Sequence, residues 1–230
     1  MVKLLFLCRR RPDIDHDRYV ALLLGGHVPI ALRHHPTMRK YVVNVVERAQ
    51  DGLPPLDSIG ELSFASLADY REHLYDSPEG RDVVQRDVAG FMGGADAYAT
   101  TEHVQKNVRP PVALGTRTPG VKMVCPVVRA AHLTHEAFVD HWLRRHVPLA
   151  LRHHPGLVKY VTNVVDARLS PDGPALDGIG ELHFASAESL AAGMFDSPDG
   201  ERAIREDIPR FIGRTGAYFV GEHVQKEETR

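Results

Sequence analysis

Histidine is the residue type that stands out first, because the chain contains 14 of them among 230 residues. Imidazole changes its charge near neutral pH, so a histidine held in a pocket can act as a general acid or base. His27 and His146 are the main candidates, since they stand at the same place in two similar segments. The alternative is structural: each ring would hydrogen-bond a backbone group beside the proline that follows it.

His141 is a further candidate, and it directly precedes Trp142. Residues four apart on a helix lie on one face, whereas His141 and His146 are five apart, which suits a shared face poorly. The chain also lacks the HExxH and CxxC patterns that hold metals. We therefore expect no bound metal.

Polar residues inside apolar strands form the next group. Asn44 and Asn163 interrupt runs rich in β-branched residues, where asparagine is disfavoured, and a buried amide needs partners. Such a side chain could bind a substrate carbonyl or phenol, or bond to a neighbouring loop. Strand alternation puts Asn44 and Tyr41 on opposite faces. Tyr41 and its counterpart Tyr160 offer apolar walls with a hydroxyl donor.

Glu181 and His183 stand two apart in an expected strand and therefore on one face. A carboxylate in this position would orient the imidazole and raise its pKa, which makes the two residues a candidate acid/base pair. The corresponding place in the first half of the chain is Ser63, so the pair exists only in the second half. The alternative is that Glu181, like Glu61, contacts a lysine or arginine of the other half.

These candidates occur in pairs because the chain is a tandem repeat. The segment HVPIALRHHPTMRKYVVN at 27–44 matches HVPLALRHHPGLVKYVTN at 146–163, and IGEL, DSP and EHVQK follow in the same order in both copies. We assign the first domain to residues 1–106 and the second to 120–230. The proline- and glycine-rich stretch at 107–119 is expected to be a linker.

Each copy predicts the order strand, helix, strand, strand, helix, strand, which is typical of an α+β ferredoxin-like (βαββαβ) fold. In the first copy these elements are expected at 2–10, 16–34, 39–47, 59–65, 66–91 and 97–106. Pro29 and Pro148 predict that the long helix ends near His27 or His146, followed by a kink and a short turn. Two sheets with bare faces can bury each other, so the tandem domains predict an intramolecular pseudo-twofold α/β barrel.

The composition is that of a soluble globular protein, with 43% hydrophobic and 25% charged residues. A formal net charge of -2 gives no electrostatic reason to expect nucleic acid or a membrane surface as a partner. No segment approaches the roughly 20 apolar residues that span a bilayer. The two cysteines, Cys8 and Cys125, are not equivalent in the repeat, which argues against a disulfide framework. We expect a cytoplasmic protein whose halves pair with each other, and we leave a further homodimer open.

Together these motifs resemble the EthD family of the dimeric α/β-barrel superfamily. The second copy carries them most fully, as Phe138, His141-Trp142, His146, Pro148, Pro155-Gly156-Leu157, Tyr160-Val161, Asn163, Glu181, Ser197–Gly200 and Glu222–Val224. The resemblance spans nearly the whole chain except the linker, and it implies the ferredoxin-like fold and barrel pairing. Relatives implied by it include cofactor-independent decarboxylases, dehydratases and cyclases of aromatic polyketide pathways, proteins tied to ether degradation, quinol monooxygenases and haem-degrading enzymes.

The first copy departs from the family pattern, since Leu22-Leu23 replace His141-Trp142. We therefore expect the better site in the second half. Its residues would be His146 as proton carrier, Asn163 as the ligand of the substrate oxygen, Trp142, Tyr160 and Phe138 as walls, and His141, Glu181 and His183 in support. His27, Tyr41 and Asn44 would be the first-half counterparts.

The sequence thus predicts a cofactor-free enzyme that acts on a small hydrophobic aromatic or polyketide-like carbonyl or phenolic compound. Decarboxylation, dehydration or cyclisation through histidine acid/base catalysis is the leading reaction class. One alternative is an oxidoreductase or monooxygenase, either cofactor-free or with haem on a histidine ligand. The other is a non-catalytic protein that binds a small molecule.

Overall fold

The computed structural model describes residues 1–227, so the last three residues of the domain expected at 120–230 lie outside the described residues. In the first half the elements are β1 (Val2–Arg10), α1 (His16–Ala21), η1 (Leu22–His27), α2 (Val28–His34), β2 (Lys40–Ala49), β3 (Ser58–Phe64), α3 (Leu67–His73), α4 (Pro78–Phe91) and β4 (Met92–Asn107). In the second half they are β5 (Val121–Arg129), α5 (His135–His141), η2 (Trp142–His146), α6 (Val147–His153), β6 (Leu157–Arg168), β7 (Gly178–Phe184), α7 (Ala187–Gly193), α8 (Pro198–Phe211), β8 (Ile212–Thr215) and β9 (Tyr218–Lys226).

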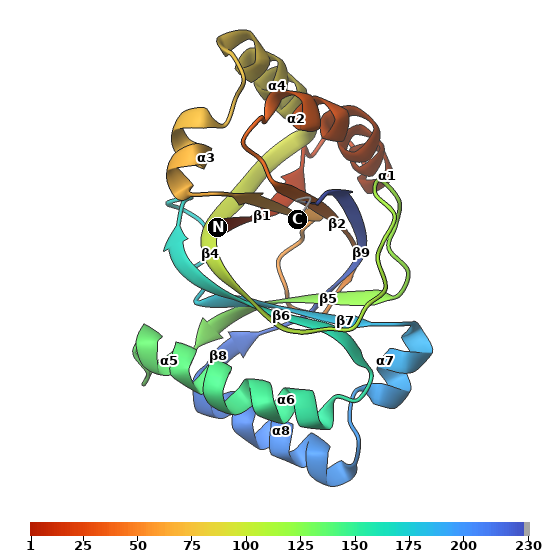
Figure 1. Ribbon diagram of the computed structural model, residues 1–230, viewed down its shortest axis with the longest axis vertical. Coiled ribbons are helices and arrows are strands. Elements are labelled where there is room, and N and C mark those ends of the chain that lie inside the picture. Colours follow the sequence, from red (N-terminus) through yellow and green to blue (C-terminus); the bar gives the residue numbers. More distant parts are fainter. Residues whose placement is uncertain (228–230) are drawn as a thin grey trace.

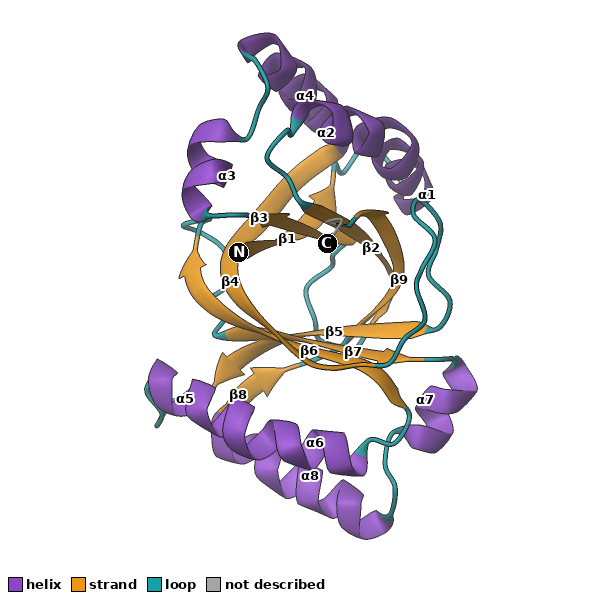
Figure 2. Ribbon diagram, in the orientation of Figure 1, coloured by secondary structure: helices purple, strands orange, loops and turns teal. Residues whose placement is uncertain are grey.

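The strands form one closed antiparallel barrel at the centre of the molecule (Figure 1). The order is β7-β6-β4-β1-β3-β2-β9-β5, and β5 returns to β7 to close the ring, while β8 is a short addition beside β5. The helices of the first half cover one side of this ring and those of the second half cover the opposite side (Figure 2). The expected pseudo-twofold barrel of two ferredoxin-like halves is therefore confirmed.

Two ladders join the halves. Strand β4 pairs with β6, placing Glu102 opposite Asn163, and β2 pairs with β9, placing Asn44 opposite Glu222. Because alternate side chains of a strand point to opposite faces, each strand has one set of side chains under the helices and another inside the barrel. The protein therefore has two kinds of interior space in which chemistry could occur, one between the sheet and the helices and one inside the barrel.

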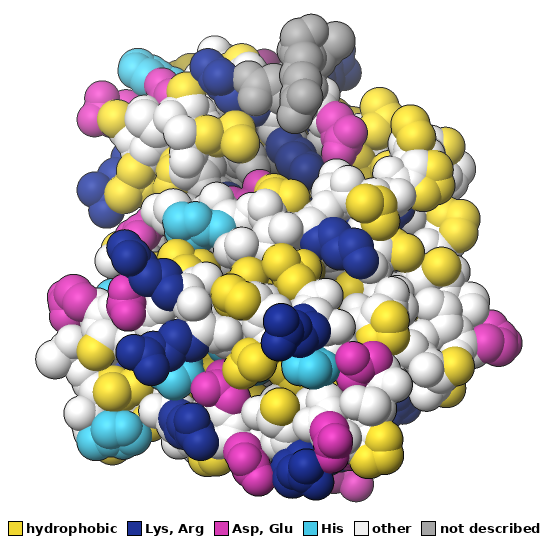
Figure 3. All heavy atoms as spheres, turned by 60° about the horizontal axis from the view of Figure 1, so that its bottom comes forward, with side chains coloured by type: hydrophobic (Ala, Val, Ile, Leu, Met, Phe, Trp, Pro, Cys, Tyr) yellow, Lys and Arg dark blue, Asp and Glu magenta, His cyan; other side chains and the backbone are white. Residues whose placement is uncertain are grey.

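Three apolar clusters correspond to this division. One lies under the first-half helices and another under the second-half helices, while a third fills the barrel with residues of both halves such as Leu5, Val124 and Ile179. Charged residues of both signs and histidines are interspersed over the helical face of the second half (Figure 3). That mixture agrees with a formal net charge of only -2.

The long helices do not break where the prolines predict. Residues 16–34 and 135–153 are each one continuous helix, in which η1 and η2 are π-helical turns. Val28 N–H bonds to Leu23 O and Val147 N–H to Trp142 O, five residues back in each case. The wider turn accommodates the proline that follows, which has no N–H to donate. The expected kink is therefore replaced by a local change of helical pitch.

The region expected as a single helical element at 66–91 divides into α3 and α4 at the repeated DSP motif, and the second half divides in the same way into α7 and α8. Ser77 caps α4 by accepting a bond from Gly80 N, and Ser197 caps α8 through Gly200 N, with the proline in the first turn each time. Asp15 caps α1 in the same manner. Within residues 1–227, none of the helices has the length and apolar character needed to cross a membrane.

Candidate functional site

A cavity of about 210 Å³ lies between the helices and the sheet in the first half. A cavity of about 150 Å³ is enough for a benzene molecule, so this space suits a substituted aromatic ring. Most of its wall is apolar, and its polar groups come from histidine, tyrosine and serine side chains. It is lined by Phe6, Cys8, Leu23, His27, Ala31, His35, Tyr41, Val43, Ser58, Gly60, Leu62, Tyr70, Leu74, Tyr75, Val84, Val88, Met92 and Ala95.

His27, the last residue of η1, reaches this cavity and is held from behind by α4. Its Nδ1 lies 2.8 Å from Oδ2 of Asp87, and its ring packs 5.5 Å from that of Phe91. A carboxylate accepts from an N–H, so the neutral ring keeps its proton on Nδ1 and presents an unprotonated Nε2. Burial lowers the pKa of His27 despite the opposing effect of Asp87. The ring is thus a neutral base near pH 7.

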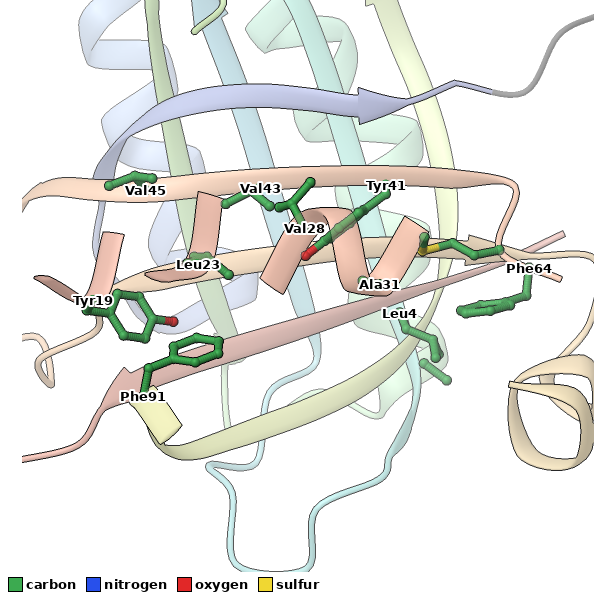
Figure 4. Packing of buried hydrophobic residues seen from close by; sticks show 12 residues of the cluster. Leu4, Tyr19, Leu23, Val28, Ala31, Tyr41, Val43, Val45, Phe64 and Phe91 are labelled. Atoms are coloured by element: carbon green, nitrogen blue, oxygen red, sulfur yellow. The ribbon is translucent and has the colours of Figure 1, made fainter. Parts of the chain in front are cut away.

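Tyr41 lines the same cavity from β2. Its side chain is buried, and its hydroxyl forms no hydrogen bond with any group in residues 1–227. Burial raises the pKa of Tyr41, so the hydroxyl stays protonated as a donor. Figure 4 shows the ring beneath Val28, with the hydroxyl directed toward the centre of the cluster. A ligand oxygen in the cavity would meet this donor.

Trp142 occupies the equivalent space in the second half. The indole stands where Leu23 stands in the first half, and it is only 3% exposed. Its Nε1–H donates to the Tyr160 hydroxyl at 3.2 Å, and Phe138 packs 5.4 Å from its ring. The three residues expected to wall a second-half pocket are therefore brought together, but they fill that space themselves.

Glycine at position 178 makes room for this indole. A Cβ at Gly178 would lie 2.2 Å from the Trp142 ring, closer than real atoms approach. The first half has Ser58 at the equivalent position, and the Ser58 hydroxyl bonds to that of Tyr19 at 2.8 Å. Tryptophan with glycine fills the second half, and leucine with serine leaves the first half open.

His141 and His146 share one carboxylate, contrary to the expectation from their spacing. His141 Nε2 lies 2.8 Å from Oδ1 of Asp207, and His146 Nδ1 lies 3.0 Å from Oδ2. A π-helical turn brings residues five apart onto one face, and η2 is such a turn. Burial acts to raise the pKa of Asp207, but the bonds from His146 and His141 lower it. Both rings also pack on Phe211.

Asn44 and Asn163 point into the barrel, away from the cavity under the helices. Asn44 Nδ2 donates to Glu61 Oε1 at 2.7 Å and to the Ile59 carbonyl at 2.9 Å. Asn163 makes the same two bonds, to Glu181 at 2.8 Å and to the carbonyl of residue 179 at 2.9 Å. The structure therefore does not bring Asn163 together with His146, and each amide serves to hold a glutamate in place.

Glu181 and Glu61 bind lysines of the opposite half, as the structural alternative anticipates. Lys3 Nζ lies 2.5 Å from Glu181 and 2.6 Å from Glu61, and Lys122 Nζ lies 2.8 Å and 2.5 Å from the same two residues. Burial and Glu181 act to raise the pKa of Glu61, but Lys122 and Lys3 lower it to about 2. The four charges form a pseudo-twofold network across the barrel.

The two remaining glutamates complete this network. Glu102 lies 2.8 Å from Lys3, and Glu222 lies 3.1 Å from Lys122 and also binds Arg109. Carboxylate oxygens of Glu61, Glu102 and Glu181 come within 4.8 Å of one another, a spacing that could hold a metal ion. The ammonium group of Lys3 contacts all three, so the lysine supplies the positive charge at that position.

His183 lies inside the barrel beside Glu181, but the pair does not behave as predicted. Its Nε2 is 3.8 Å from Glu181 Oε2, too far for a hydrogen bond. Burial lowers the pKa of His183 to about 4 against the raising effect of Glu181, with Lys122 also lowering it. The expected increase in pKa is therefore wrong, because desolvation outweighs the carboxylate. His183 is a neutral ring at physiological pH.

Sequence reasoning missed Asp87 and Asp207, which hold the candidate histidines. The two aspartates are 120 residues apart and occupy the same place in the two copies of the repeat. Each precedes a phenylalanine by four residues, and this regularity could have identified them. Lys3 and Lys122 were also missed. They occupy equivalent positions at the start of the first strand of each half, and a charged residue repeated within an apolar strand is the signal they offered.

The closed barrel built from two similar halves makes this a tandem protein of the α/β-barrel type. Residues 11–95 and 130–215 each match the EthD domain, and the chain belongs to the EthD domain family. No curated protein sequence matches the chain.

Several solved structures share the fold over almost the full chain. A provisionally assigned monooxygenase from Fusobacterium nucleatum subsp. nucleatum is 9% identical with a TM-score of 0.63, covering 100% of this chain and 94% of its own. An anthrone oxidase-like protein is 11% identical with a TM-score of 0.61, covering 99% and 94%. Chlorite dismutase from Candidatus Nitrospira defluvii, in complex with imidazole, is 13% identical with a TM-score of 0.56, covering 96% and 90%. Such identities indicate a shared fold only.

Proposed function

We propose that this protein is a cofactor-independent enzyme that moves a proton on a small hydrophobic carbonyl or phenolic compound bound in the first-half cavity. The observation that carries the proposal is the His27–Asp87 pair at the wall of an apolar cavity that also contains the Tyr41 hydroxyl, unpaired within residues 1–227. Asp87 orients the ring and stabilises the imidazolium that forms. We therefore place the catalytic site in the first half, although the sequence favours the second half.

In this mechanism His27 Nε2 removes a proton from a phenolic hydroxyl or from a carbon next to a carbonyl. Tyr41 donates a hydrogen bond to the substrate oxygen, where negative charge develops. The apolar wall strengthens both interactions, because charges interact more strongly where water is excluded. His27 can then return its proton elsewhere on the substrate, as decarboxylation, dehydration or cyclisation each requires.

Reaction of the resulting anion with O2 is the second candidate function. It is favoured by the names of the structural neighbours, which include provisionally assigned monooxygenases and an anthrone oxidase-like protein. Both candidates share the first step at His27 and differ in the fate of the anion. We assign no haem to this cavity, because a volume of about 210 Å³ lies below even the roughly 300 Å³ at which pockets for drug-sized ligands begin.

Proton transfer at carbon can be tested without the natural substrate. The protein is incubated in D2O with a panel of acetophenones and cyclic 1,3-diketones, and exchange of the acidic C–H is followed by NMR. We expect catalysed exchange that falls by about 100-fold in His27→Gln, a loss within the range of one general base. Asp87→Asn should lower the rate less, and His103→Gln, outside the cavity lining, should leave it unchanged.

Three results decide between the candidates. Exchange that is unchanged in His27→Gln would eliminate His27 as the base. Loss of exchange in His146→Gln, with His27→Gln still active, would move the reaction to the second half. Oxygen uptake with the same compounds and with anthrone, dependent on His27, would select the monooxygenase reaction over proton return.

A further inference from the structure

The first-half cavity has a polar end that the proposed proton transfer does not use. Cys8 and Ser58 are neighbours across the β1–β3 ladder, and both line the cavity. Tyr19 of α1 lies behind them, and its hydroxyl is 2.8 Å from that of Ser58. All three side chains are buried. A thiol and two hydroxyls are therefore grouped beside a space whose wall is otherwise mostly apolar.

The equivalent positions of the second half carry no polar side chain. Val127 replaces the thiol, Phe138 replaces the tyrosine and Gly178 replaces the serine. There the indole of Trp142 lies against Gly178 and fills the space under the helices. The polar groups thus accompany the open cavity, as expected if they serve a ligand rather than the scaffold that the two halves share.

The pair of hydroxyls has one hydrogen more than it uses. Ser58 and Tyr19 have two O–H groups between them, and one O–H suffices for the bond that joins them. Within residues 1–227 neither hydroxyl bonds to any other oxygen or nitrogen atom. Burial raises the pKa of the Cys8 thiol to about 11, although Ser58 and Tyr19 act to lower it, so the sulfur beside them is a neutral, weak acceptor. When Tyr19 donates to Ser58, the serine hydroxyl is free to donate into the cavity.

This donor lies about one helical turn from the proposed base. By the repeat, Ser58 lies beneath Leu23, where the second half has its indole over a glycine. His27 follows Leu23 by four residues on the same helix, and one helical turn advances roughly 5 Å. A single aromatic ring with an oxygen substituent at each end spans a comparable distance. One ligand can therefore contact His27 and Ser58 together.

We propose that Ser58 determines specificity in the first-half cavity by donating a hydrogen bond to a second oxygen atom of the substrate. This inference rests on the proposed function, in which His27 and Tyr41 engage the reacting oxygen. The substrate is then an aromatic carbonyl or phenol with another hydroxyl or carbonyl oxygen at the far end of its ring. Tyr19 is a positioning residue, because its hydroxyl donates to Ser58 and so turns the serine hydrogen toward the ligand. A ligand with a methyl group in place of that oxygen leaves the donor unpaired.

Binding of two ketones of similar shape tests the proposal without any reaction. 4-Hydroxyacetophenone has an oxygen at each end of its ring, and 4-methylacetophenone has a methyl group in place of the second oxygen. In NMR titrations the wild-type protein should bind the hydroxy ketone about fivefold more tightly or better, the value of one neutral hydrogen bond. Ser58→Ala should bind the two ketones with nearly equal Kd. The control Ser63→Ala, outside the cavity lining, should keep the wild-type preference.

The role of Tyr19 has its own readout. Tyr19→Phe, which copies the second half, keeps the aromatic ring and the Ser58 hydroxyl but removes the bond that orients the serine. The preference for the hydroxy ketone should therefore fall, by less than in Ser58→Ala, while the affinity for the methyl ketone stays as in the wild-type protein. A loss of affinity for both ketones alike would show that Tyr19 serves packing only.

The outcomes separate this inference from the proposed function. Equal affinity of the wild-type protein for the two ketones would overturn the role of Ser58, whether or not His27 catalyses exchange. A preference that persists in a folded Ser58→Ala protein would overturn it as well. A Ser58-dependent preference without catalysed exchange would remove the enzyme and keep the binding contact. Absence of binding of either ketone up to about 10 mM would overturn both.

A crystal structure provides a check that needs no variant. Wild-type crystals soaked in 4-hydroxyacetophenone should show the ring in the first-half cavity, with one ligand oxygen within about 3.0 Å of Ser58 Oγ, the usual limit for a bond between hydroxyls. A ligand that binds there with both oxygens away from Ser58 would contradict the proposal.

Discussion

At the scale of single residues, the two halves differ at two equivalent positions in the space under the helices. Leu23 in the first half corresponds to Trp142 in the second, and Ser58 corresponds to Gly178. A Cβ at residue 178 would collide with the indole, so the tryptophan and the glycine depend on each other. Tyr160 bonds to the indole, whereas the equivalent Tyr41 hydroxyl has no partner within residues 1–227. The sequence motif richest in chemistry, His141-Trp142, therefore marks the filled half of the molecule.

This dependence predicts how the two cavities respond to exchange of these residues. Leu23→Trp with Ser58→Gly should fill the first-half cavity and abolish proton exchange and ligand binding there. Leu23→Trp alone should be less stable than the double variant, because the Ser58 Cβ stands where the indole needs space. Urea unfolding should give the single variant a free energy of unfolding about 1–3 kcal/mol lower than that of the double variant, the usual cost of an overpacked core. Equal stability of the single and double variants would contradict the packing argument.

The candidate residues could be found from the sequence, but their grouping could not. Alternation correctly separated Asn44 from Tyr41, and the repeat identified His27 and His146. Which space stays open depends on how Trp142 turns against a glycine on another strand, and no local pattern encodes that contact. The direction of the pKa shift at His183 depended on burial by residues distant in sequence, which spacing alone cannot weigh against the nearby Glu181.

At the scale of elements, the π-helical turns set the positions of the histidines. Prolines predicted a break in each long helix, but a break is only one way to accommodate a missing N–H. In η2 the wider turn aligns His141 with His146 on Asp207, and in η1 it directs His27 to Asp87. The order of strands and helices followed from the pattern of each copy, whereas this change of pitch did not.

Replacing two first-half glycines, Gly25 and Gly80, by alanine should change the stability of the protein in opposite directions. A Cβ at Gly25, which is exposed in η1, meets nothing within 4 Å, so Gly25→Ala should stabilise the protein by about 0.5–1 kcal/mol. A Cβ at Gly80 would lie 2.0 Å from Asp76 Oδ1 and 2.7 Å from His34 Nδ1. Gly80→Ala should therefore disrupt the His34–Asp76 contact that ties α2 to the start of α4.

Urea unfolding of both variants measures the difference. The loss expected for Gly80→Ala is about 1–3 kcal/mol, typical of a forced steric shift. Gly200 has the same surroundings in the second half, with its Cβ 2.1 Å from Asp196 and 2.6 Å from His153, so Gly200→Ala serves as an independent replicate. A Gly80→Ala protein as stable as wild type would show that the loop adjusts freely.

At the scale of the whole molecule, the barrel interior should make the protein sensitive to acid. Lys122 and Lys3 hold the pKa of Glu61 at about 2, against burial and Glu181, and burial lowers the pKa of His183 to about 4. The unfolded values are about 4.3 and 6.5. Both groups bind more protons in the unfolded state, so their contribution to stability is complete above about pH 7. Stability falls first between about pH 6.5 and 4, where His183 is protonated only in the unfolded chain, and then between about pH 4.3 and 2, where the same holds for Glu61.

Urea midpoints measured between pH 8 and pH 3 test this dependence. His183→Ser should remove part of the loss between pH 6.5 and pH 4, because serine does not titrate, and should leave the loss below pH 4 in place. A wild-type midpoint that stays constant from pH 7 to pH 4 would be incompatible with a neutral buried His183.

The barrel also makes the two halves parts of one folding unit. The β4–β6 and β2–β9 ladders join them, and the interior cluster contains residues of both halves. The Lys122–Glu61 and Lys3–Glu181 ion pairs also connect one half to the other. The tandem repeat and the bare sheet face were enough to predict this pairing from the sequence. The ion network was not predictable, because its partners are far apart along the chain.

Cleavage of the linker should therefore not separate the halves. A protease site inserted after Ala113, next to the exposed Leu114, would cut the chain within a segment that belongs to neither ladder. The fragments should elute together on gel filtration in native buffer, because separation would expose the interior cluster and break the Lys122–Glu61 and Lys3–Glu181 ion pairs. Breaking one buried ion pair alone costs about 3–5 kcal/mol. Since a short linker supplies a millimolar effective concentration, cutting it should make the urea midpoint depend on protein concentration, unlike that of the intact chain. Fragments that separate at micromolar concentration in native buffer would show that each half is a domain that folds on its own.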